Sequence, residues 1–390
     1  MIRSCRESFP SKLLLLLVIF WGWGSCSLTL AQGDREEIRV LLQEGVEQVT
    51  IVGTRSYQIL SPSSPLLHLS RQVTIRAEKK GMIIAKVFYP VQRLLFRSSQ
   101  PENRFGIGSY QYRGELEVRQ TGPGRLQVIN VVPLRYYLYG VLPQEIDPDW
   151  KMEVLKAQAV AARTYALYRK MGSAGREYDV RADVWDQLYR GYTGEDPRTN
   201  RAVDETAGEI LVYKGKPIAA YYHADAGGYT EDSRYVWSIS YPYLQSVRSF
   251  YGADSPYATW ELTLSTTEIG RRFRAAGYPL DEVTGVTVVQ RSPTGRVLLV
   301  KVHHKRGVLW LKGTTFRKII GINTLLSTLF WTQKKGGKIH FQGRGWGHGV
   351  GLSQWGAKEM AELGFTYPEI LQFYYRGVTL TQVNGRKDTP

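Results

Sequence analysis

The chain has 390 residues, of which 43% are hydrophobic and 22% charged, and this composition excludes a disordered or low-complexity protein. Its formal net charge of +16 favours an anionic partner, such as nucleic acid, a cell-wall polymer or lipid head groups. An ordinary solvated basic surface is the alternative explanation of this charge.

Residues 1–31 have the pattern of a secretory signal peptide. Basic residues between Arg3 and Lys12 precede the apolar run Leu13–Trp23, and a small residue, Ala31, ends the segment. The run is too short to span a bilayer comfortably, so an uncleaved anchor is the less favoured alternative. We therefore expect an exported protein of the periplasm or cell wall that meets the membrane only through this segment. Export argues against nucleic acid as the partner.

Both cysteines, Cys5 and Cys26, lie inside the predicted signal peptide. The rest of the chain can then form no disulfide, no thiolate metal site and no cysteine nucleophile. The histidines show no H-E-x-x-H motif or paired ligand spacing, so we expect no metal and no other cofactor.

Short apolar runs separated by turns predict strands from Ile38 to about Val131, with a clear hairpin turn in RQTGPGRLQ. We expect a β-rich N-terminal module at residues 32–111. Next, Asp147-Pro148 is typical of a helix start, and that helix is predicted to run to about Lys170. Its many alanines indicate that it is largely buried.

Later segments also carry clear signals of secondary structure. Residues 208–232 read as two strands followed by a glycine loop, and residues 266–277 and 312–321 as helices. A helix from Leu352 to about Leu363 is expected to end at Gly364, and Thr366 with Glu369 forms a capping-box pattern for a last helix.

The segment GRGWGHGVG (Gly343–Gly351) is neither a P-loop nor a dinucleotide fingerprint. Its glycines allow close backbone approach, and Trp346 and His348 are predicted to project from it. It is either the wall of a binding site or a tight structural crossing. Ser353, which follows, lacks the G-x-S-x-G pattern of a hydrolase nucleophile.

Glu145 has the most suggestive setting among the polar residues. It ends an apolar, Tyr-rich stretch and precedes the predicted helix start. A partly buried carboxyl group there would have a raised pKa and suit general acid catalysis. The alternative is an acidic residue that complements the dipole at a helix start.

Three separated segments, in order, carry a family resemblance: Tyr137–Leu167, Ala220–Trp237 and Gly343–Ala357. Together they resemble the stage II sporulation protein D/LytB family, and the likeness covers roughly Tyr112 to Thr379. The resemblance implies an α+β protein in which the β-rich N-terminal module is followed by a mixed α/β core with a central cleft. We place this core at residues 112–380 and a C-terminal tail at 381–390.

Members of that family act on peptidoglycan. The sporulation proteins are lytic transglycosylases that cut between N-acetylmuramic acid and N-acetylglucosamine in strands stripped of stem peptides, and other members are amidase enhancers. The resemblance therefore implies a lytic transglycosylase that binds glycan strands. The alternative is a non-catalytic wall-binding activator of a partner N-acetylmuramoyl-L-alanine amidase.

The family motifs match positions of this chain residue by residue. The catalytic acidic residue of the family corresponds to Glu145. The resemblance also implies a substrate-binding set, in which the aromatic residues suit stacking on sugar rings: Lys156, Gln158, Arg163, Tyr222, His223, Gly227, Gly228, Tyr229, Trp346, His348, Ser353 and Gln354. Ion pairing of Lys156 with Glu153, and core packing of the aromatic residues, are the alternatives. Some members have cysteines beside the matching histidine in a metal site, and this sequence lacks them.

Overall fold

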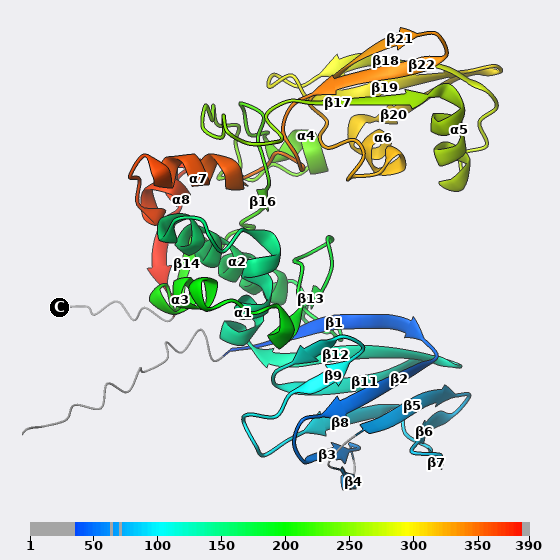
Figure 1. Ribbon diagram of the computed structural model, residues 1–390, viewed down its shortest axis with the longest axis vertical. Helices are drawn as coiled ribbons and strands as arrows, with labels where there is room; N and C mark the ends of the chain where they lie inside the picture. The colour runs from blue at the N-terminus through cyan, green and yellow to red at the C-terminus, as the bar shows by residue number, and fades with distance from the viewer. Residues whose placement is uncertain (1–35, 63–64, 70–71, 384–390) are drawn as a thin grey trace, which may run out of the picture. The chain divides into compact units, whose positions relative to one another are not determined.

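The computed structural model describes residues 36–62, 65–69 and 72–383. The predicted signal peptide therefore lies outside the described residues, as do residues 384–390 of the predicted tail. Within the described part, helices and strands are mixed among several sheets, with a β-rich N-terminal region, which confirms the predicted α+β class (Figure 1). None of the described helices is long and apolar enough to cross a membrane.

Two sheets build the N-terminal region. The seven-stranded sheet, in the order β13-β1-β12-β11-β8-β3-β4, contains β1 (Glu37–Val46), β3 (Tyr57–Leu60), β4 (Pro65–Leu69), β8 (Arg93–Arg97), β11 (Glu115–Gly122), β12 (Arg125–Pro133) and β13 (Val180–Arg181). The six-stranded sheet, in the order β10-β9-β2-β5-β6-β7, contains β2 (Gln48–Gly53), β5 (Gln72–Glu78), β6 (Gly81–Ile84), β7 (Val87–Tyr89), β9 (Phe105–Ile107) and β10 (Tyr110–Tyr112).

Alternation of buried and exposed side chains explains how these sheets pack. In β5, every second residue is buried, and side chains from both sheets, including Ile75 and Phe96, join one hydrophobic core. The predicted hairpin is confirmed as the β11–β12 pair. Because β12 also pairs with β1, the seven-stranded sheet includes residues from both sides of the expected module boundary at residue 111.

A helical part follows, which packs partly into the core of the sheets and partly into a second hydrophobic core. Its elements are α1 (Leu134–Glu145), α2 (Met152–Met171), the 3-10 helix η2 (Gly191–Gly194), α3 (Pro197–Glu205), β14 (Glu209–Tyr213), β15 (Lys216–Pro217), β16 (Tyr222–His223), α4 (Ser233–Trp237), β23 (Leu352–Ser353), α7 (Gln354–Glu362), α8 (Tyr367–Tyr374) and β24 (Thr379–Gln382). α2 is central, because it packs against α1, α3, α7 and α8. Its alanines at positions 157, 159, 161, 162 and 166 are fully buried, as the sequence predicts.

The start of α2 corrects the sequence prediction. The helix begins at Met152, not at Asp147, because the Asp147 carboxylate accepts the backbone N–H of Asp149 at 2.9 Å within a turn. The Tyr-rich stretch before that turn is the helix α1, so Glu145 is the last residue of one helix rather than the neighbour of a helix start.

The elements between Trp260 and Gly343 form a third lobe. They are β17 (Trp260–Ser265), α5 (Thr266–Ala275), β18 (Val283–Arg291), β19 (Val297–His304), β20 (Gly307–Lys312), α6 (Gly313–Ile320), β21 (Phe330–Lys335) and β22 (Lys338–Gly343). They form two three-stranded sheets, β17-β22-β21 and β18-β19-β20. Phe273 of α5 and Phe316 of α6 pack with Phe330 and Phe341 of the strands in a separate hydrophobic core. The helices predicted at 266–277 and 312–321 are therefore confirmed.

Candidate functional site

The carboxyl group of Glu145 is held at the end of α1. Its Oε1 accepts the backbone N–H of Leu188 at 2.7 Å. The side chain is partly exposed, yet burial raises its pKa from 4.5 to about 7, and the Leu188 bond lowers that pKa only in part. The partial negative charge of a helix C-terminus also disfavours a carboxylate. Glu145 is therefore suited to keep a proton near neutral pH, and the dipole-complementing alternative does not apply.

A pair of glutamines lies next to the backbone of Glu145. Gln354, at the start of α7, donates from Nε2 to the backbone carbonyl oxygen of Glu145 at 2.9 Å. The same Nε2 lies 3.4 Å from Oε1 of Gln158, which is fully buried on α2. The structure thus brings three of the sequence-predicted residues together.

Tyr222 belongs to the same group. Its hydroxyl accepts from Nε2 of Gln187 at 3.0 Å, while Oε1 of Gln187 accepts from the hydroxyl of Tyr137 at 3.1 Å. Burial raises the pKa of Tyr222, and the charge of Glu145 raises it further, which places Tyr222 within electrostatic range of that carboxyl group. Gln187 and Leu188 were missed by the sequence analysis, because their segment carries no motif and gains its role only by folding back onto α1.

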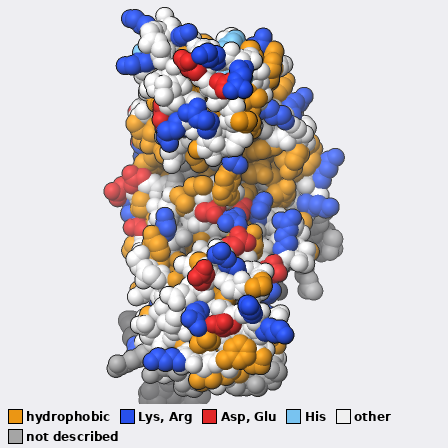
Figure 2. All heavy atoms as spheres, turned by 90° about the vertical axis from the view of Figure 1, so that its right-hand side faces the viewer, with side chains coloured by type: hydrophobic (Ala, Val, Ile, Leu, Met, Phe, Trp, Pro, Cys, Tyr) orange, Lys and Arg blue, Asp and Glu red, His pale blue; other side chains and the backbone are white. Residues whose placement is uncertain are grey.

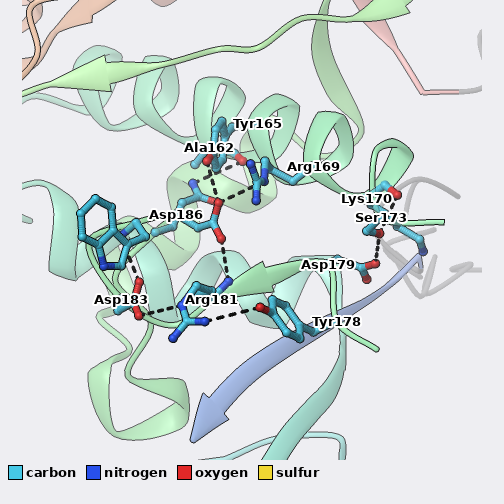
Figure 3. A network of polar contacts seen from close by, with 12 residues as sticks. Ala162, Tyr165, Arg169, Lys170, Ser173, Tyr178, Asp179, Arg181, Asp183 and Asp186 are labelled. Carbon is cyan, nitrogen blue, oxygen red and sulfur yellow. Dashed lines mark hydrogen bonds and ion pairs between the residues drawn. The ribbon is translucent and has the colours of Figure 1, made fainter. Parts of the chain in front are cut away.

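A polar network holds the segment that carries Leu188 (Figure 3). The buried carboxylate of Asp186 accepts from the hydroxyl of Tyr165 at 2.8 Å and from the backbone N–H of Arg181 at 2.9 Å. It also pairs with Nε of Arg169 at 3.0 Å. Because Tyr165 and Arg169 lie on α2, this network ties the segment to the central helix two residues before Leu188.

Lys156 and Arg163 have protein partners in the structure. Lys156 pairs with Glu205 at 2.7 Å and with Glu153 at 3.6 Å. Arg163 is fully buried and donates to the carbonyl oxygens of Val203 and Glu209 at 2.9 and 3.3 Å. Their substrate-binding role stays a prediction, and the partners give both residues a structural task.

The histidine–glycine loop and the GRGWGHGVG segment cross each other closely. Asp225 and Trp346 exchange two backbone hydrogen bonds of 3.0 and 2.9 Å. A Cβ on Gly345 would lie 2.6 Å from the carbonyl oxygen of Asp225, and one on Gly227 would lie 2.9 Å from the backbone of Arg344. Glycine is therefore required at both positions for this crossing.

Polar groups around the crossing are largely buried. The rings of His223 and His348 lie 5.5 Å apart, and burial, with the charges of nearby arginines, lowers the pKa of His348 to about 3. Oγ of Ser353 accepts the N–H of Ala226 at 3.1 Å. Trp346 packs on Tyr257 with ring centroids 4.5 Å apart.

Strand pairing joins this crossing to the Glu145 site. β16 and β23 are parallel partners, with Tyr222 opposite Leu352 and His223 opposite Ser353. Tyr222 reaches Gln187 beside Leu188, whereas His223 contacts Val350 of the glycine segment. Tyr229 and Gly228 lie farther along the loop; Tyr229 is 41% exposed, and a Cβ on Gly228 would meet open space. Their substrate contacts stay predictions.

Among the described residues, the donor atoms around His223 are too few for a metal site. The buried Nε2 of His223 and Oδ2 of Asp225 have no hydrogen-bond partner within the described residues. However, the described part of the chain contains no group of three or more His, Cys, Asp or Glu that could hold a metal ion. A histidine and one carboxylate without thiolates are too few ligands for a structural zinc site.

Comparison with known proteins identifies the family of this chain. A family model described as stage II sporulation protein matches residues 123–213, and a domain of unknown function, DUF8618, matches residues 242–351. Stage II sporulation protein D of Bacillus subtilis is 31% identical over 275 residues, covering 66% of this chain and 77% of that protein. The chain therefore belongs to the stage II sporulation protein D family.

Two further relatives extend the comparison. An uncharacterised protein of Brachyspira hyodysenteriae is 31% identical over 332 residues, covering 85% of this chain and 88% of that protein. A Bacillus subtilis protein named amidase enhancer is 33% identical over 293 residues, covering 63% of this chain and 40% of that protein. The match thus spans two fifths of the amidase enhancer.

Proposed function

We propose that this protein is a peptidoglycan lytic transglycosylase in which Glu145 is the single acid and base. The observation that carries the proposal is the setting of Glu145, whose carboxyl group is bound by the N–H of Leu188 and has a pKa raised to about 7. Such a group is protonated in a large fraction of molecules at neutral pH and can both give and accept a proton there. Family membership supports a role on the bacterial cell wall.

The proposed reaction needs one carboxyl group. Glu145 gives its proton to the leaving glycosidic oxygen of N-acetylglucosamine as the bond to C1 of N-acetylmuramic acid breaks. The ionised Glu145 then accepts the proton of the muramic acid 6-hydroxyl while that oxygen bonds to C1. The product is an anhydromuramic end, and no water is consumed. A second carboxylate, which ordinary glycosidases use, is not required.

The proposed substrate is a glycan strand stripped of its stem peptides. Gln354 bonds the backbone carbonyl oxygen of Glu145 and also lies within 3.4 Å of Gln158, so the carboxyl group is presented on fixed elements rather than on a free loop. Rigid placement of an acid favours catalysis because the reacting atoms must align to within a fraction of an ångström. Tyr222 accepts a hydrogen bond from Gln187 and so supports the segment next to Leu188.

Digestion of amidase-treated glycan strands, followed by mass spectrometry of the ends, tests this proposal. We expect anhydromuramic products from the wild type and a loss of at least about 10²-fold in Glu145→Gln. Asp149→Asn is the matched control, because its exposed carboxylate lies four residues away. The rate should fall as pH rises through about 7, where Glu145 loses its proton. Unchanged product formation in Glu145→Gln would make the catalytic assignment wrong.

A second candidate is a non-catalytic enhancer of a cell-wall amidase, favoured by the 33% identity to the protein of that name. Adding the purified protein to an amidase digest of whole cell walls separates the two. Equal stimulation by the wild type and Glu145→Gln, with no anhydromuramic ends from either, supports the enhancer.

We also propose that the protein works outside the cytoplasmic membrane, in the periplasm or cell wall. The basic and apolar pattern of residues 1–31 supports export. Cell fractionation combined with N-terminal sequencing checks this. A full-length chain in the cytoplasm would contradict it.

A further inference from the structure

The third lobe presents one face of its strands to solvent. The two sheets adjoin along β18 and β21, where Arg291 donates to the carbonyl oxygen of Phe330 at 2.8 Å. Helices α5 and α6 lie on one side of the strands (Figure 1). Since strand side chains alternate, the residues next to the buried Phe330 and Phe341 point to the opposite side. We call this side the outer face, and define it by Trp310, Lys301, Trp331, Arg291 and His340.

Two exposed tryptophans occupy the outer face, each with a cation over its ring. Trp310 is 51% exposed, and Nζ of Lys301 lies 4.2 Å from its ring centroid. Trp331 is 47% exposed, with the guanidinium of Arg291 at 5.2 Å. A single exposed tryptophan needs no explanation, but here the same pairing of an indole ring with a cation occurs on both sheets of one face.

A hollow lies beside Trp331 and is lined by polar side chains. Thr263, His340 and Gln333 stand side by side on β17, β22 and β21, and the next row holds Glu261, Gln342 and Trp331. A row of amide, hydroxyl and imidazole groups around a flat indole is suited to a sugar ring, which offers hydroxyls at its edge and C–H groups on its face.

The lobe also carries most of the excess positive charge. Residues 260–343 include fourteen Lys or Arg and four Asp or Glu, a formal net charge of +10 out of +16 for the chain. Two of the four acidic residues are already paired, Glu268 with Arg271 and Arg272, and Asp281 with Arg306. Many Lys and Arg side chains, with a few Asp and Glu among them, are exposed on this lobe (Figure 2). The net charge of the lobe, together with Lys301 and Arg291 on the outer face itself, favours an anionic ligand there.

From these observations we infer that the outer face of the third lobe is a second binding surface, which holds an anionic glycan strand through Trp310 and Trp331 and its cations. The inference rests on the proposed function for the identity of the strand. Peptide-stripped peptidoglycan fits the chemistry, since each muramic acid bears a lactyl carboxylate beside its pyranose ring. The surface would keep the protein on its polymer while Glu145 acts elsewhere on the chain.

Binding of amidase-stripped glycan strands to the immobilised protein tests this inference. The measurement uses the Glu145→Gln background so that strands stay intact. We expect Trp310→Ala with Trp331→Ala to weaken binding by about tenfold or more, because buried aromatic anchors dominate such contacts. Phe88→Ala is the control, because Phe88 is similarly exposed, at 51%, on the N-terminal region. Binding should also weaken as salt rises.

Matched ligands identify what the face recognises. Strands whose carboxyl groups have been converted to amides, and uncharged N-acetylglucosamine oligomers, should bind about tenfold or more weakly. Equal binding of these neutral ligands, or full binding by the double tryptophan variant, overturns the inference. So does tighter, tryptophan-dependent binding to RNA or to vesicles of anionic phospholipid.

The two proposals fail in distinguishable ways. In the Glu145-containing protein, the double tryptophan variant should still cleave short soluble strands at the wild-type rate. If no form of the protein cleaves glycan but the tryptophans are needed for binding, the surface stands and the catalytic role fails. If cleavage depends on Glu145 but binding does not depend on the tryptophans, the catalytic role stands and the binding surface fails.

Discussion

Gln354 donates from its side-chain Nε2 to the backbone carbonyl oxygen of Glu145 at 2.9 Å, and so joins the first residue of α7 to the last residue of α1. Carbonyl groups at a helix C-terminus lack partners within the helix, so this bond satisfies one of them. The Leu188 N–H holds the carboxyl group of the same residue. Glu145 is therefore positioned by groups 209 and 43 residues away in the sequence.

Glu145→Gln should stabilise the protein at neutral and alkaline pH. Because the pKa of Glu145 rises from 4.5 to about 7 on folding, the folded protein keeps a proton that the unfolded chain releases in this window. Stability contributed by that proton is therefore lost as pH rises from about 4.5 to 7, by ~3 kcal/mol in total. Glutamine has no such loss. Thermal melting should show little difference from the wild type at pH 5 and a more stable variant at pH 8.

Glu205→Gln provides the control with the opposite sign. The hydrogen bond from Lys156 lowers the pKa of Glu205, so its carboxylate stabilises the fold at neutral pH and loses this effect only in acid. This variant should be less stable than the wild type at pH 8. An equal shift of Glu145→Gln at pH 5 and pH 8 would contradict the assigned pKa.

Local features of the fold could be predicted from the sequence, because local contacts create them. The capping box of Thr366 and Glu369 is present, and Gly364, with φ of 94°, follows α7 as expected. Asp147-Pro148 misled the prediction because an aspartate can bond its own backbone in a turn as well as at a helix start. The helix α1 has no clear signal in the sequence, because Pro143 lies inside it.

The candidate site could be predicted only in part. Glu145 was found from its local setting and from the family motifs, but the cause of its raised pKa is burial by segments that approach only in three dimensions. Leu188 and Gln187 carry no signature, because one acts through its backbone and the other through a common amide. The ion pair of Lys156 with Glu153 could be predicted from the sequence, because the two residues are three apart on one helix. The partners of Lys156 and Arg163 on α3 and after it could not, because they approach only in the fold.

Arg163→Met should destabilise the protein far more than Lys156→Met. Arg163 is fully buried and donates to the carbonyl oxygens of Val203 and Glu209, which would lose these bonds in the variant. We expect a loss of about 3 kcal/mol in the free energy of unfolding. Lys156 pairs with Glu205 near the surface, and its loss should cost about 1 kcal/mol or less. Urea unfolding measures both, and equal losses would argue against a structural role for Arg163.

Asp186→Asn should alter the pH dependence of glycan cleavage as well as stability. Asp186 ties the segment that carries Leu188 to Tyr165 and Arg169 on α2. The hydrogen bond from Leu188 lowers the pKa of Glu145. Loosening the segment weakens this bond, so the pKa of Glu145 should rise in the variant. The falling limb of the pH–rate profile should then move to higher pH, with a loss of about 2 kcal/mol in stability.

Asp183→Asn tests whether that shift is specific. Asp183 lies on the same segment but pairs with Arg181 at the surface, with its side chain 42% exposed. Its profile should coincide with that of the wild type. If the role of Asp186 is merely structural, the variant should have a lower rate at every pH, and the falling limb of its pH–rate profile should stay at the wild-type pH.

Gly349→Ala should be strongly destabilising because of a contact that the sequence gives no reason to expect. Gly349 has φ of 84°, and a Cβ there would lie 2.4 Å from the guanidinium carbon of Arg296. Arg296 is 2% exposed and donates to the carbonyl oxygen of Ala226 at 2.7 Å, so its side chain cannot move into solvent. Gly364→Ala is the control, because its φ is 94° and a Cβ meets open space.

Backbone strain alone accounts for ~1–2 kcal/mol at either glycine. Gly349→Ala should lose ~2 kcal/mol more than Gly364→Ala in urea unfolding, which is the typical cost of overpacking a filled interior. A double-mutant cycle with Arg296→Met then identifies the cause. If the guanidinium is the obstacle, the paired variant costs clearly less than the sum of the single ones. If the two costs simply add, the strain lies in the backbone of the GRGWGHGVG segment and not in its contact with Arg296.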